Sequence, residues 1–192
     1  MGAGTNKVVE INENANWYAV YSKHNHERKS ADLLARKGIQ VFLPLYRSVR
    51  TWKDRKKTLA MPLFPGYVFL KSTLTNKIEI LSTPGVFFIV ENAGHACAIP
   101  EEQIQAIHAI VESSVRFEPH PFLRSGEFVR IRSGPLSGIS GIIVKPKNKY
   151  RVVVSIELLR KAVAIEVDAA DVEAIAKTVE ASPANRSRRE AP

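Results

Sequence analysis

The apolar residues near the start of the chain are spaced first as in a β-strand and then as in a helix. Asn16–Ser22 (NWYAVYS) is rich in aromatic and β-branched residues that alternate between two faces, which predicts a strand. His26–Lys37 places Ala31 and Leu34 on one helical face, and Gly38 is a plausible stop. The chain is therefore expected to begin its fold with a strand followed by a helix.

Further strands and one short helix follow, with turn signals at residues 84–85 before the last of these strands. Strands are predicted at Val41–Val49, Gly66–Lys71 and Val86–Val90, and a short helix at Thr75–Leu81. Pro44 is tolerable in such a strand only at an edge or a bulge.

Pro100 opens an amphipathic helix, since Pro suits the first helical turn. Ile104, Ile107, His108 and Val111 recur at helical spacing and are expected to form one packed stripe. The order strand–helix–strand–strand–helix–strand, with this terminal helix added, predicts a split βαβ, ferredoxin-like layer of helices on an antiparallel sheet.

The pattern changes at Phe117–Leu123 (FEPHPFL), where two prolines disfavour helix and predict an extended linker. Beyond it, short apolar runs alternate with Gly- and Pro-containing turns and no helix intervenes, which predicts a small five-stranded β-barrel. The fold class is therefore α+β. The expected barrel strands are Glu127–Arg132, Ile139–Lys145, Tyr150–Ile156, Lys161–Val167 and Val172–Ile175.

Charge adds a candidate for nucleic-acid contact. The chain carries 28 Lys and Arg against 19 Asp and Glu, a net charge of +9. Arg47–Lys57 (RSVRTWKDRKK) holds six basic residues and one Asp, and so contributes +5 of that total. This segment is either a solvated loop or a phosphate-contacting finger, and the sequence alone does not separate the two.

Several classes of protein are disfavoured by what the sequence lacks. Cys97 is the single cysteine, which excludes an internal disulfide and a multi-cysteine zinc site and fits a reducing compartment. His24 and His26 have no Cys or carboxylate cluster beside them in sequence, so no metal site is expected there. Phosphate-binding loops, dinucleotide fingerprints and nucleophile elbows are absent from the sequence. We expect neither an enzyme nor a cofactor, and the sequence shows neither an apolar signal core nor a membrane span.

Two groups of motifs resemble a known family. The segment SGEFVRIRSGPLSGISGIIVKP resembles the KOW motif of ribosomal proteins and transcription elongation factors. NWYAVYSK, PLFPGYVFL at Pro62–Leu70 and STPGV at Ser82–Val86 resemble the N-terminal (NGN) domain of NusG proteins. TWKDRKK, EPHPFLRSGEFVRIRSGPLSG and VSIELLRKAVAIEVDAADVE are closer to the specialised paralogues, the RfaH and UpxY antiterminators.

This resemblance implies an organisation and a function. It implies a transcription antitermination or elongation factor, acting in the cytoplasm as a monomer, that binds RNA polymerase and suppresses pausing or termination. The implied SH3-like KOW barrel would recruit a second partner. The predicted parts are an N-terminal tail at 1–15, an NGN domain at 16–114, a linker at 115–122, a KOW domain at 123–176 and a C-terminal tail at 177–192.

The resemblance also implies contact residues in the NGN domain. NusG-type domains bind the clamp helices of the largest polymerase subunits through an apolar patch, whose positions here are Phe64, Pro65, Tyr67 and Phe69. The sequence alone favours a core position for all four, and the resemblance reverses this for Tyr67 and Phe64. Contacts to upstream or non-template DNA are expected from the basic segment and from the region between the first strand and helix. The candidates are Arg50, Lys53, Arg55, Lys56, Lys57, Lys23, His24 and Arg28.

The sequence leaves more than one candidate for the partner of the barrel. Relatives bind Rho or ribosomal protein NusE near the PLSGISG turn, where Leu136 and Ile139 stand in place of a common Phe. This departure puts the Rho contact in doubt and leaves NusE as a candidate. Two other functions remain open, namely a housekeeping NusG that supports Rho-dependent termination, and a KOW-type RNA-binding or ribosome-associated module. The β-branched run Arg151–Ile156 favours a stable barrel over a helical hairpin.

Overall fold

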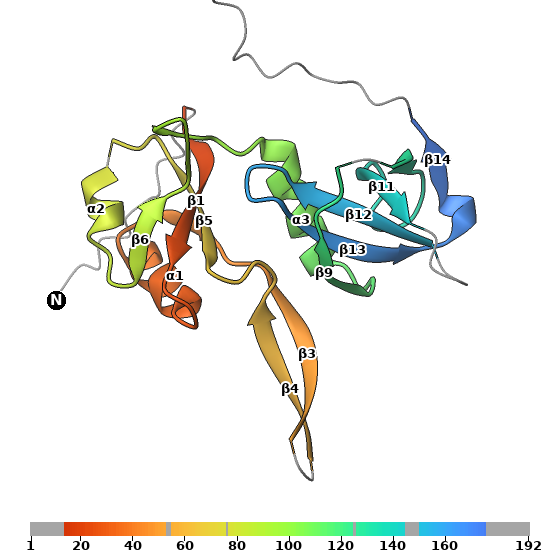
Figure 1. Ribbon diagram of the computed structural model, residues 1–192, viewed down its shortest axis with the longest axis horizontal. Helices are drawn as coiled ribbons and strands as arrows, with labels where there is room; N and C mark the ends of the chain where they lie inside the picture. The colour runs from red at the N-terminus through yellow and green to blue at the C-terminus, as the bar shows by residue number, and fades with distance from the viewer. Residues whose placement is uncertain (1–13, 53–54, 76, 125, 145–149, 176–192) are drawn as a thin grey trace, which may run out of the picture.

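The computed structural model describes residues 14–52, 55–75, 77–124, 126–144 and 150–175, and the side chains at 50, 52, 55 and 56 lie outside this description. The predicted tails at 1–13 and 176–192 also lie outside it. The described chain forms an N-terminal domain, a C-terminal β-domain beside it, and a two-stranded ribbon that projects from the N-terminal domain (Figure 1).

The N-terminal domain is built on a four-stranded antiparallel sheet in the order β2-β5-β1-β6. The helix between β1 and β2 and the helix between β5 and β6 each join two strands that run in the same direction with another strand between them. This arrangement confirms the predicted split βαβ, ferredoxin-like sheet. The elements are β1 (Asn16–Ser22), α1 (Glu27–Arg36), β2 (Gln40–Phe42), β5 (Tyr67–Ser72), α2 (Lys77–Leu81) and β6 (Val86–Ile89).

Each face of this sheet packs into a different apolar core, because successive side chains on a strand point to opposite sides. Val20 and Leu70 face α1 and α2, where Leu34 and Ile80 are fully buried. Trp17, Ala19 and Phe69 lie on the other face. Both faces are therefore covered over most of their length.

Helix α3 (Glu101–Glu112) covers the second face. Its buried residues are Ile104, Ile107 and Ile110, and burying each isoleucine side chain contributes roughly 1.5–3 kcal/mol. The predicted stripe is wrong at His108, whose side chain is 51% exposed and lies against the Phe42 ring and the Glu112 carboxylate. The helix is rotated so that Ile110 faces the core.

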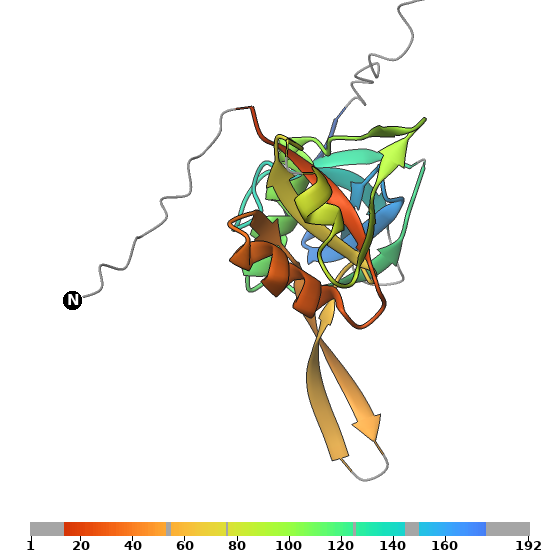
Figure 2. The same ribbon diagram turned by 90° about the vertical axis from the view of Figure 1, so that its left-hand side faces the viewer.

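The predicted strand Val41–Val49 is divided at Pro44. Residues 40–42 form β2, and β3 (Leu45–Trp52) leaves the sheet to pair with β4 (Arg55–Pro62) over eight residue pairs. The basic segment therefore forms a two-stranded antiparallel ribbon, which extends well away from both domains in Figure 1 and Figure 2. A smaller hairpin follows β6, made of β7 (Glu91–Asn92) and β8 (His95–Ala96).

The C-terminal domain is a six-stranded antiparallel sheet in the order β14-β10-β11-β12-β13-β9. The five predicted strands are all present. The sixth, β9 (Phe117–Pro121), corrects the predicted linker: it pairs with β13 as an edge strand, where its prolines are tolerated. The remaining elements are β10 (Phe128–Ile131), β11 (Ser140–Val144), β12 (Tyr150–Ile156), β13 (Lys161–Val167), the 3₁₀ turn η1 (Ala169–Asp171) and β14 (Val172–Ala174).

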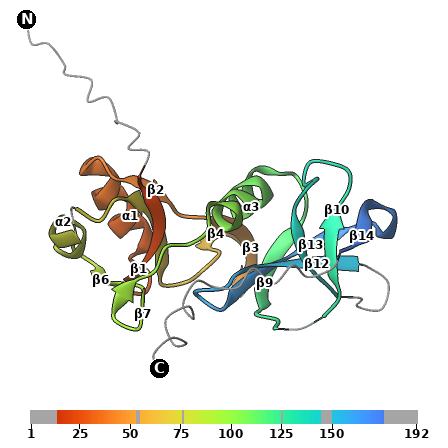
Figure 3. The ribbon, with the colours of Figure 1, turned by 90° about the horizontal axis from the view of Figure 1, so that it is seen from above.

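The two domains touch through α3, which lies between them when the molecule is viewed from above (Figure 3). The backbone N–H of Glu157 donates a hydrogen bond to the Gln103 side-chain oxygen at 3.2 Å. The α3 isoleucines belong to the same apolar core as Val154 and Ile156 of β12. One helix thus contributes to the interiors of both domains.

The first turn of α3 is tied to the sheet by Glu101. Its carboxylate accepts a hydrogen bond from Trp17 Nε1 at 3.1 Å and pairs with Lys71 Nζ at 3.0 Å. Partial burial acts to raise the pKa of Glu101, but the hydrogen bonds from Lys71 and Trp17 outweigh it, so the pKa lies below its usual value. A lowered pKa in the folded state stabilises the protein above the unfolded pKa, and that stability is lost as the pH falls through the folded value.

We predict that Glu101→Gln lowers stability at pH 7 by less than about 1 kcal/mol, because the ion pair is partly exposed to solvent. The difference from wild type should shrink as the pH falls below the unfolded glutamate pKa of about 4.3, and disappear once the pH is below the lower folded pKa of Glu101. Urea unfolding across this pH range measures it. Glu102→Gln, at the next position of α3, is the matched control. A difference that does not change with pH would contradict the prediction.

Candidate functional site

An aromatic cluster lies at the end of the sheet where the covering by α3 stops. Tyr21 on β1 is paired in register with Tyr67 on β5 and with Phe88 on β6. The Tyr21 ring lies 5.4 Å from the Tyr67 ring and is stacked 5.2 Å from the Phe88 ring and 6.2 Å from the Phe87 ring. We call Tyr21, Tyr67, Phe87 and Phe88 the aromatic surface.

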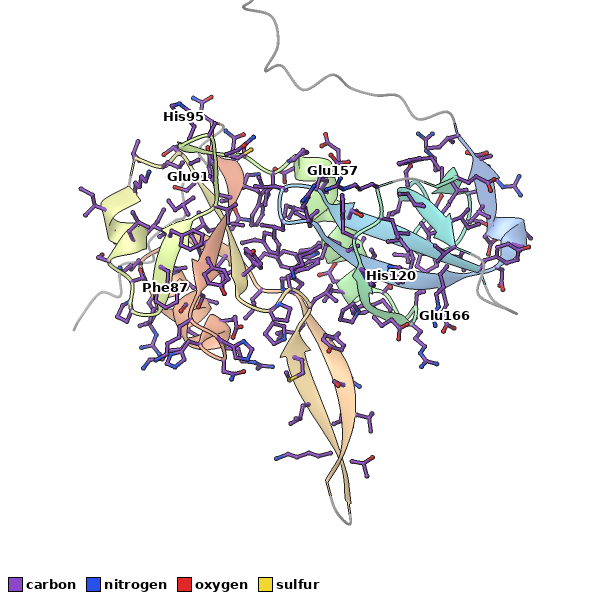
Figure 4. The ribbon with its side chains drawn as sticks, viewed as in Figure 1. Phe87, Glu91, His95, His120, Glu157 and Glu166 are labelled. Atoms are coloured by element: carbon purple, nitrogen blue, oxygen red, sulfur yellow. The ribbon has the colours of Figure 1, made fainter. Side chains whose placement is uncertain are left out.

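The aromatic surface is open to solvent although its residue types favour burial. Phe87 is 59% and Phe88 51% exposed, and Tyr67 is half-buried. Figure 4 shows Phe87 on β6, on the opposite side of the N-terminal domain from Glu157 and the C-terminal domain. Burial raises the pKa of Tyr67, and the neighbouring Tyr21 raises it further, so the phenol stays neutral at physiological pH. This surface offers apolar ring area together with phenol hydroxyls, a composition typical of interface anchors.

Only part of the predicted apolar patch lies at this surface. Pro65 is exposed and Tyr67 belongs to the aromatic surface, but Phe64 is 1% and Phe69 0% exposed. Those two rings pack edge-to-face at 5.7 Å inside the core shared with α3. Phe69 shares the face of Tyr67, as expected from strand alternation, but it lies where that face is covered. In this structure Phe64 and Phe69 are therefore core residues, and neither is accessible as a contact residue in the present arrangement.

The turn that leads into Tyr67 requires a glycine. The Tyr67 N–H donates to the Phe64 carbonyl at 3.0 Å, and Gly66 between them has a φ of +84°. A Cβ at Gly66 would lie 2.8 Å from the Tyr21 ring. Both the left-handed backbone and the closeness of the ring therefore exclude a side chain at this position.

The predicted DNA-contacting residues divide between the ribbon and α1. Arg50 and Lys57 are opposite each other in register, and Lys57 is exposed. Arg55 and Lys56 lie on β4, with side chains outside the described structure, and Lys53 lies outside the described residues altogether.

Lys23, His24 and Arg28 are exposed around the start of α1. Arg28 Nη2 donates a hydrogen bond to the Ala60 carbonyl on β4 at 2.8 Å. The structure thus places the α1 candidates near the base of the ribbon and the ribbon candidates toward its tip.

The predicted partner residues of the C-terminal domain face the interior of the molecule. Leu136 is 3% exposed, and Ile139 is partly buried against the apolar core that includes α3. A cavity of about 760 Å³ lies between α3 and the turn Ser137–Gly141, with Ile139 in its wall. Leu136 is therefore not available to a second protein while the two domains are packed as they are here.

Two further kinds of site to consider in the described residues are a metal centre and a membrane span. Among the described residues, no three His, Cys, Asp or Glu side chains come together as a metal site would require. In the same part of the chain, no helix is both long and apolar enough to cross a membrane.

Comparison with known proteins agrees with this architecture. Residues 15–108, which contain the sheet, the ribbon and most of α3, match the family model described as transcription termination factor nusG. The N-terminal part of the chain is a NusG-type domain. The family comprises transcription factors that act in termination and antitermination, and the NusG-type N-terminal domain carries both the aromatic surface and the basic ribbon.

The alignments of known proteins with this chain cover most of the length of those proteins. The transcription termination/antitermination proteins NusG of Staphylococcus aureus strains Mu50 and N315 are 26% identical over 170 residues, covering 79% of this chain and 91% of theirs. A solved structure described as "Domain interaction in Thermotoga maritima NusG" is 22% identical with a TM-score of 0.53, covering 84% of this chain and 98% of its own. That likeness supports the two-domain fold.

Sequence reasoning missed three members of the aromatic surface, namely Tyr21, Phe87 and Phe88. A signal for them was present, since Phe87 and Phe88 follow Pro84-Gly85 much as Tyr67 follows Pro65-Gly66. What the sequence does not show is that β5 and β6 flank β1, which places the aromatic residues after both turns beside Tyr21.

We predict that Gly66→Ala destabilises the protein by about 2 kcal/mol or more, because the strain of a left-handed alanine adds to the clash with the Tyr21 ring. Gly38→Ala is the control, since Gly38 has a φ of +81° with nothing within 4 Å of its added Cβ. The free energy of unfolding of that variant should fall only by the backbone strain of a left-handed alanine, about 1 kcal/mol. Denaturant midpoints measure both variants, and equal losses would show that the Tyr21 contact imposes no constraint.

Proposed function

We propose that this protein is a transcription elongation factor that binds the clamp helices of RNA polymerase through the aromatic surface and suppresses pausing or termination in the cytoplasm. The observation that carries the proposal is the exposed cluster of Tyr21, Tyr67, Phe87 and Phe88 at the open end of an otherwise covered sheet. Aromatic rings held in solvent by a rigid scaffold are typical of binding anchors, and an apolar helical partner would bury them.

The basic ribbon suits a different role within the same complex. It presents Arg47 and Lys57 as exposed cations on a two-stranded arm that projects away from the domains. Lys and Arg on such an arm contribute charge and orientation when they meet phosphates, and little base specificity. We infer that the ribbon lies along upstream or non-template DNA, with Arg50, Lys53, Arg55 and Lys56 adding to its charge.

The region around the start of α1 extends this basic surface. Lys23, His24 and Arg28 are exposed there, and Arg28 fastens the helix to the base of the ribbon. A non-template strand that reaches the ribbon can therefore contact both groups.

We favour a specialised, RfaH- or UpxY-like antiterminator over a housekeeping NusG. Leu136 and Ile139 replace the common Phe of the KOW turn, and this departure weakens the case for Rho. A second partner such as ribosomal protein NusE would contact this turn once the C-terminal domain has moved from α3, because Leu136 is buried in the present arrangement.

We predict that Tyr67→Ala and Phe88→Ala each weaken binding to core RNA polymerase at least fivefold, about 1 kcal/mol, because each removes an anchor ring. Ile78→Ala is the matched control, since Ile78 is 86% exposed on α2 and lies outside the aromatic surface. Binding is measured with purified core polymerase, and circular dichroism checks that each variant is folded. Failure of the wild-type chain to bind polymerase, together with tight binding to structured RNA, would favour the RNA-binding alternative instead.

We predict that the protein increases read-through in purified transcription on templates that carry a pause and a Rho-dependent terminator. The double variant Lys56→Ala/Lys57→Ala should keep its binding to core polymerase but lose part of the salt-sensitive affinity for the elongation complex. The slope of log affinity against log salt should fall by about 1 for each phosphate contact that is removed.

The double variant Arg160→Ala/Lys161→Ala removes the same charge from exposed positions of the C-terminal domain and serves as the control. It should retain the wild-type slope. Stimulated termination by Rho in place of read-through would identify the protein as a housekeeping NusG.

A further inference from the structure

Two turns of the same design lead into the strands that carry the aromatic surface. In Phe64–Tyr67 the last N–H donates to the first carbonyl at 3.0 Å, and in Thr83–Val86 it does so at 3.0 Å as well. Each turn has Pro in its second position and a glycine with positive φ in its third, at +84° and +92°. The first turn places Tyr67 at the start of β5, and the second leads into Phe87 and Phe88 on β6.

The first turn is held on both sides of Gly66 by the junction between β1 and α1. The Gly66 N–H donates to the Glu27 carboxylate at 2.8 Å. The Gly66 carbonyl accepts a hydrogen bond from the backbone N–H of Ser22 at 2.7 Å. Glu27 is only 3% exposed, and charged side chains are rarely buried so completely without a dedicated partner.

The second turn is held by the same junction. The Gly85 carbonyl accepts from the backbone N–H of Lys23 at 2.8 Å, and the Ser30 hydroxyl lies 3.4 Å from the Pro84 carbonyl, its acceptor. Ser30 Oγ also lies 3.0 Å from Ser22 Oγ, and both serines are fully buried. A Cβ on Gly85 would lie 2.6 Å from the Ser30 hydroxyl.

The buried side chains Ser22, Glu27 and Ser30 therefore form a polar clamp between the two turns. Because β5 and β6 flank β1, this clamp sets the spacing of the two outer strands where they present their rings on either side of Tyr21. A simple core would fill this position with apolar side chains, since burying polar groups contributes little net stability. These buried polar groups contribute direction, because Glu27 and Ser30 each fix one turn by a directional hydrogen bond and the Ser22 hydroxyl holds Ser30.

We propose that Glu27 is a positioning residue for the aromatic surface: its carboxylate fixes the Phe64–Tyr67 turn, and thereby the Tyr67 ring, in the orientation that binds polymerase. The inference rests on the proposed function of this surface. Glu27 is also the first residue of α1, followed directly by Arg28, which holds the base of the ribbon through Ala60. One helical turn thus orients both proposed contact regions.

The test compares Glu27→Ala with Glu27→Gln in the full-length chain. Alanine removes the acceptor and leaves the Gly66 N–H unpaired, whereas glutamine keeps a side-chain oxygen at the same reach. We expect Glu27→Ala to raise the Kd for core RNA polymerase about tenfold, as expected for the loss of one well-oriented anchor. We expect Glu27→Gln to restore binding to within about threefold of wild type, the remainder being the difference between a charged and a neutral acceptor.

Nuclear magnetic resonance provides a readout that does not depend on polymerase. In Glu27→Ala the Gly66 amide should lose its protection from hydrogen exchange, and the contact between the Tyr21 and Tyr67 rings should weaken, while Glu27→Gln keeps both. Ile104→Val, a core change on α3, controls for a general loss of stability and should leave both signals and the Kd unchanged well below its unfolding midpoint.

The outcomes separate the two proposals. The positioning role is overturned if Glu27→Ala binds polymerase within twofold of wild type, or if Glu27→Gln fails to restore Gly66 protection and binding. If the wild-type chain does not bind polymerase, the proposed function fails. The Gly66 amide and the Tyr21–Tyr67 contact then decide whether Glu27 orients the turn.

Discussion

The structure depends on the burial of both faces of strands β1 and β5. Their alternating side chains enter two separate cores, one under α1 and α2 and the other under α3. Such a strand pair is hydrophobic on both sides, and every position along it must be covered or left as an exposed apolar patch. α3 covers the half that holds Trp17 and Phe69. Over the other half, α3 does not cover the sheet. There Tyr21 packs against Tyr67 and against exposed rings such as Phe88.

This constraint also explains why the two domains are in contact. α3 places its isoleucines in a core that continues from Trp17 and Phe69 of the sheet to Ile156 of the C-terminal domain. Because α3 is packed into the interiors of both domains, it fixes how they are placed relative to each other in this structure. Leu136 and Ile139 of the C-terminal domain belong to or pack against this same core.

Most of the fold was predictable from the sequence, because its elements are locally encoded. β1, β12 and β13 have the predicted bounds, since β-branched and aromatic residues define each run and polar residues or turns end it. Strands β4 and β9 were missed for a common reason. Their strand character comes from pairing with a partner, β3 for β4 and β13 for β9, and local composition rich in charge or proline conceals it. His108 was misplaced because a stripe predicted from spacing does not fix the rotation of the helix.

The candidate site was less predictable than the fold, because the exposure of a side chain depends on the whole tertiary structure. Phe64, Tyr67 and Phe69 are neighbours in sequence and similar in chemistry, yet two are fully buried and one reaches the surface. Which of them is exposed depends on where α3 ends, and Phe87 and Phe88 join the surface only because β6 lies beside β1. The polar clamp was invisible for the same reason, since Glu27 and Gly66 are 39 residues apart.

The apolar and charged surfaces of this protein suit different parts of one task. Rings gathered around Tyr21 gain affinity by leaving water, an effect that depends little on salt, and they bind only a partner of complementary shape. In the function proposed above, the ribbon acts through charge, which is screened by salt and independent of base sequence, and which therefore suits DNA that moves past a fixed point. α1 contacts both surfaces, the turn before Tyr67 through Glu27 and the ribbon through Arg28. A factor anchored to a protein by one surface can thus remain in contact with moving DNA through the other.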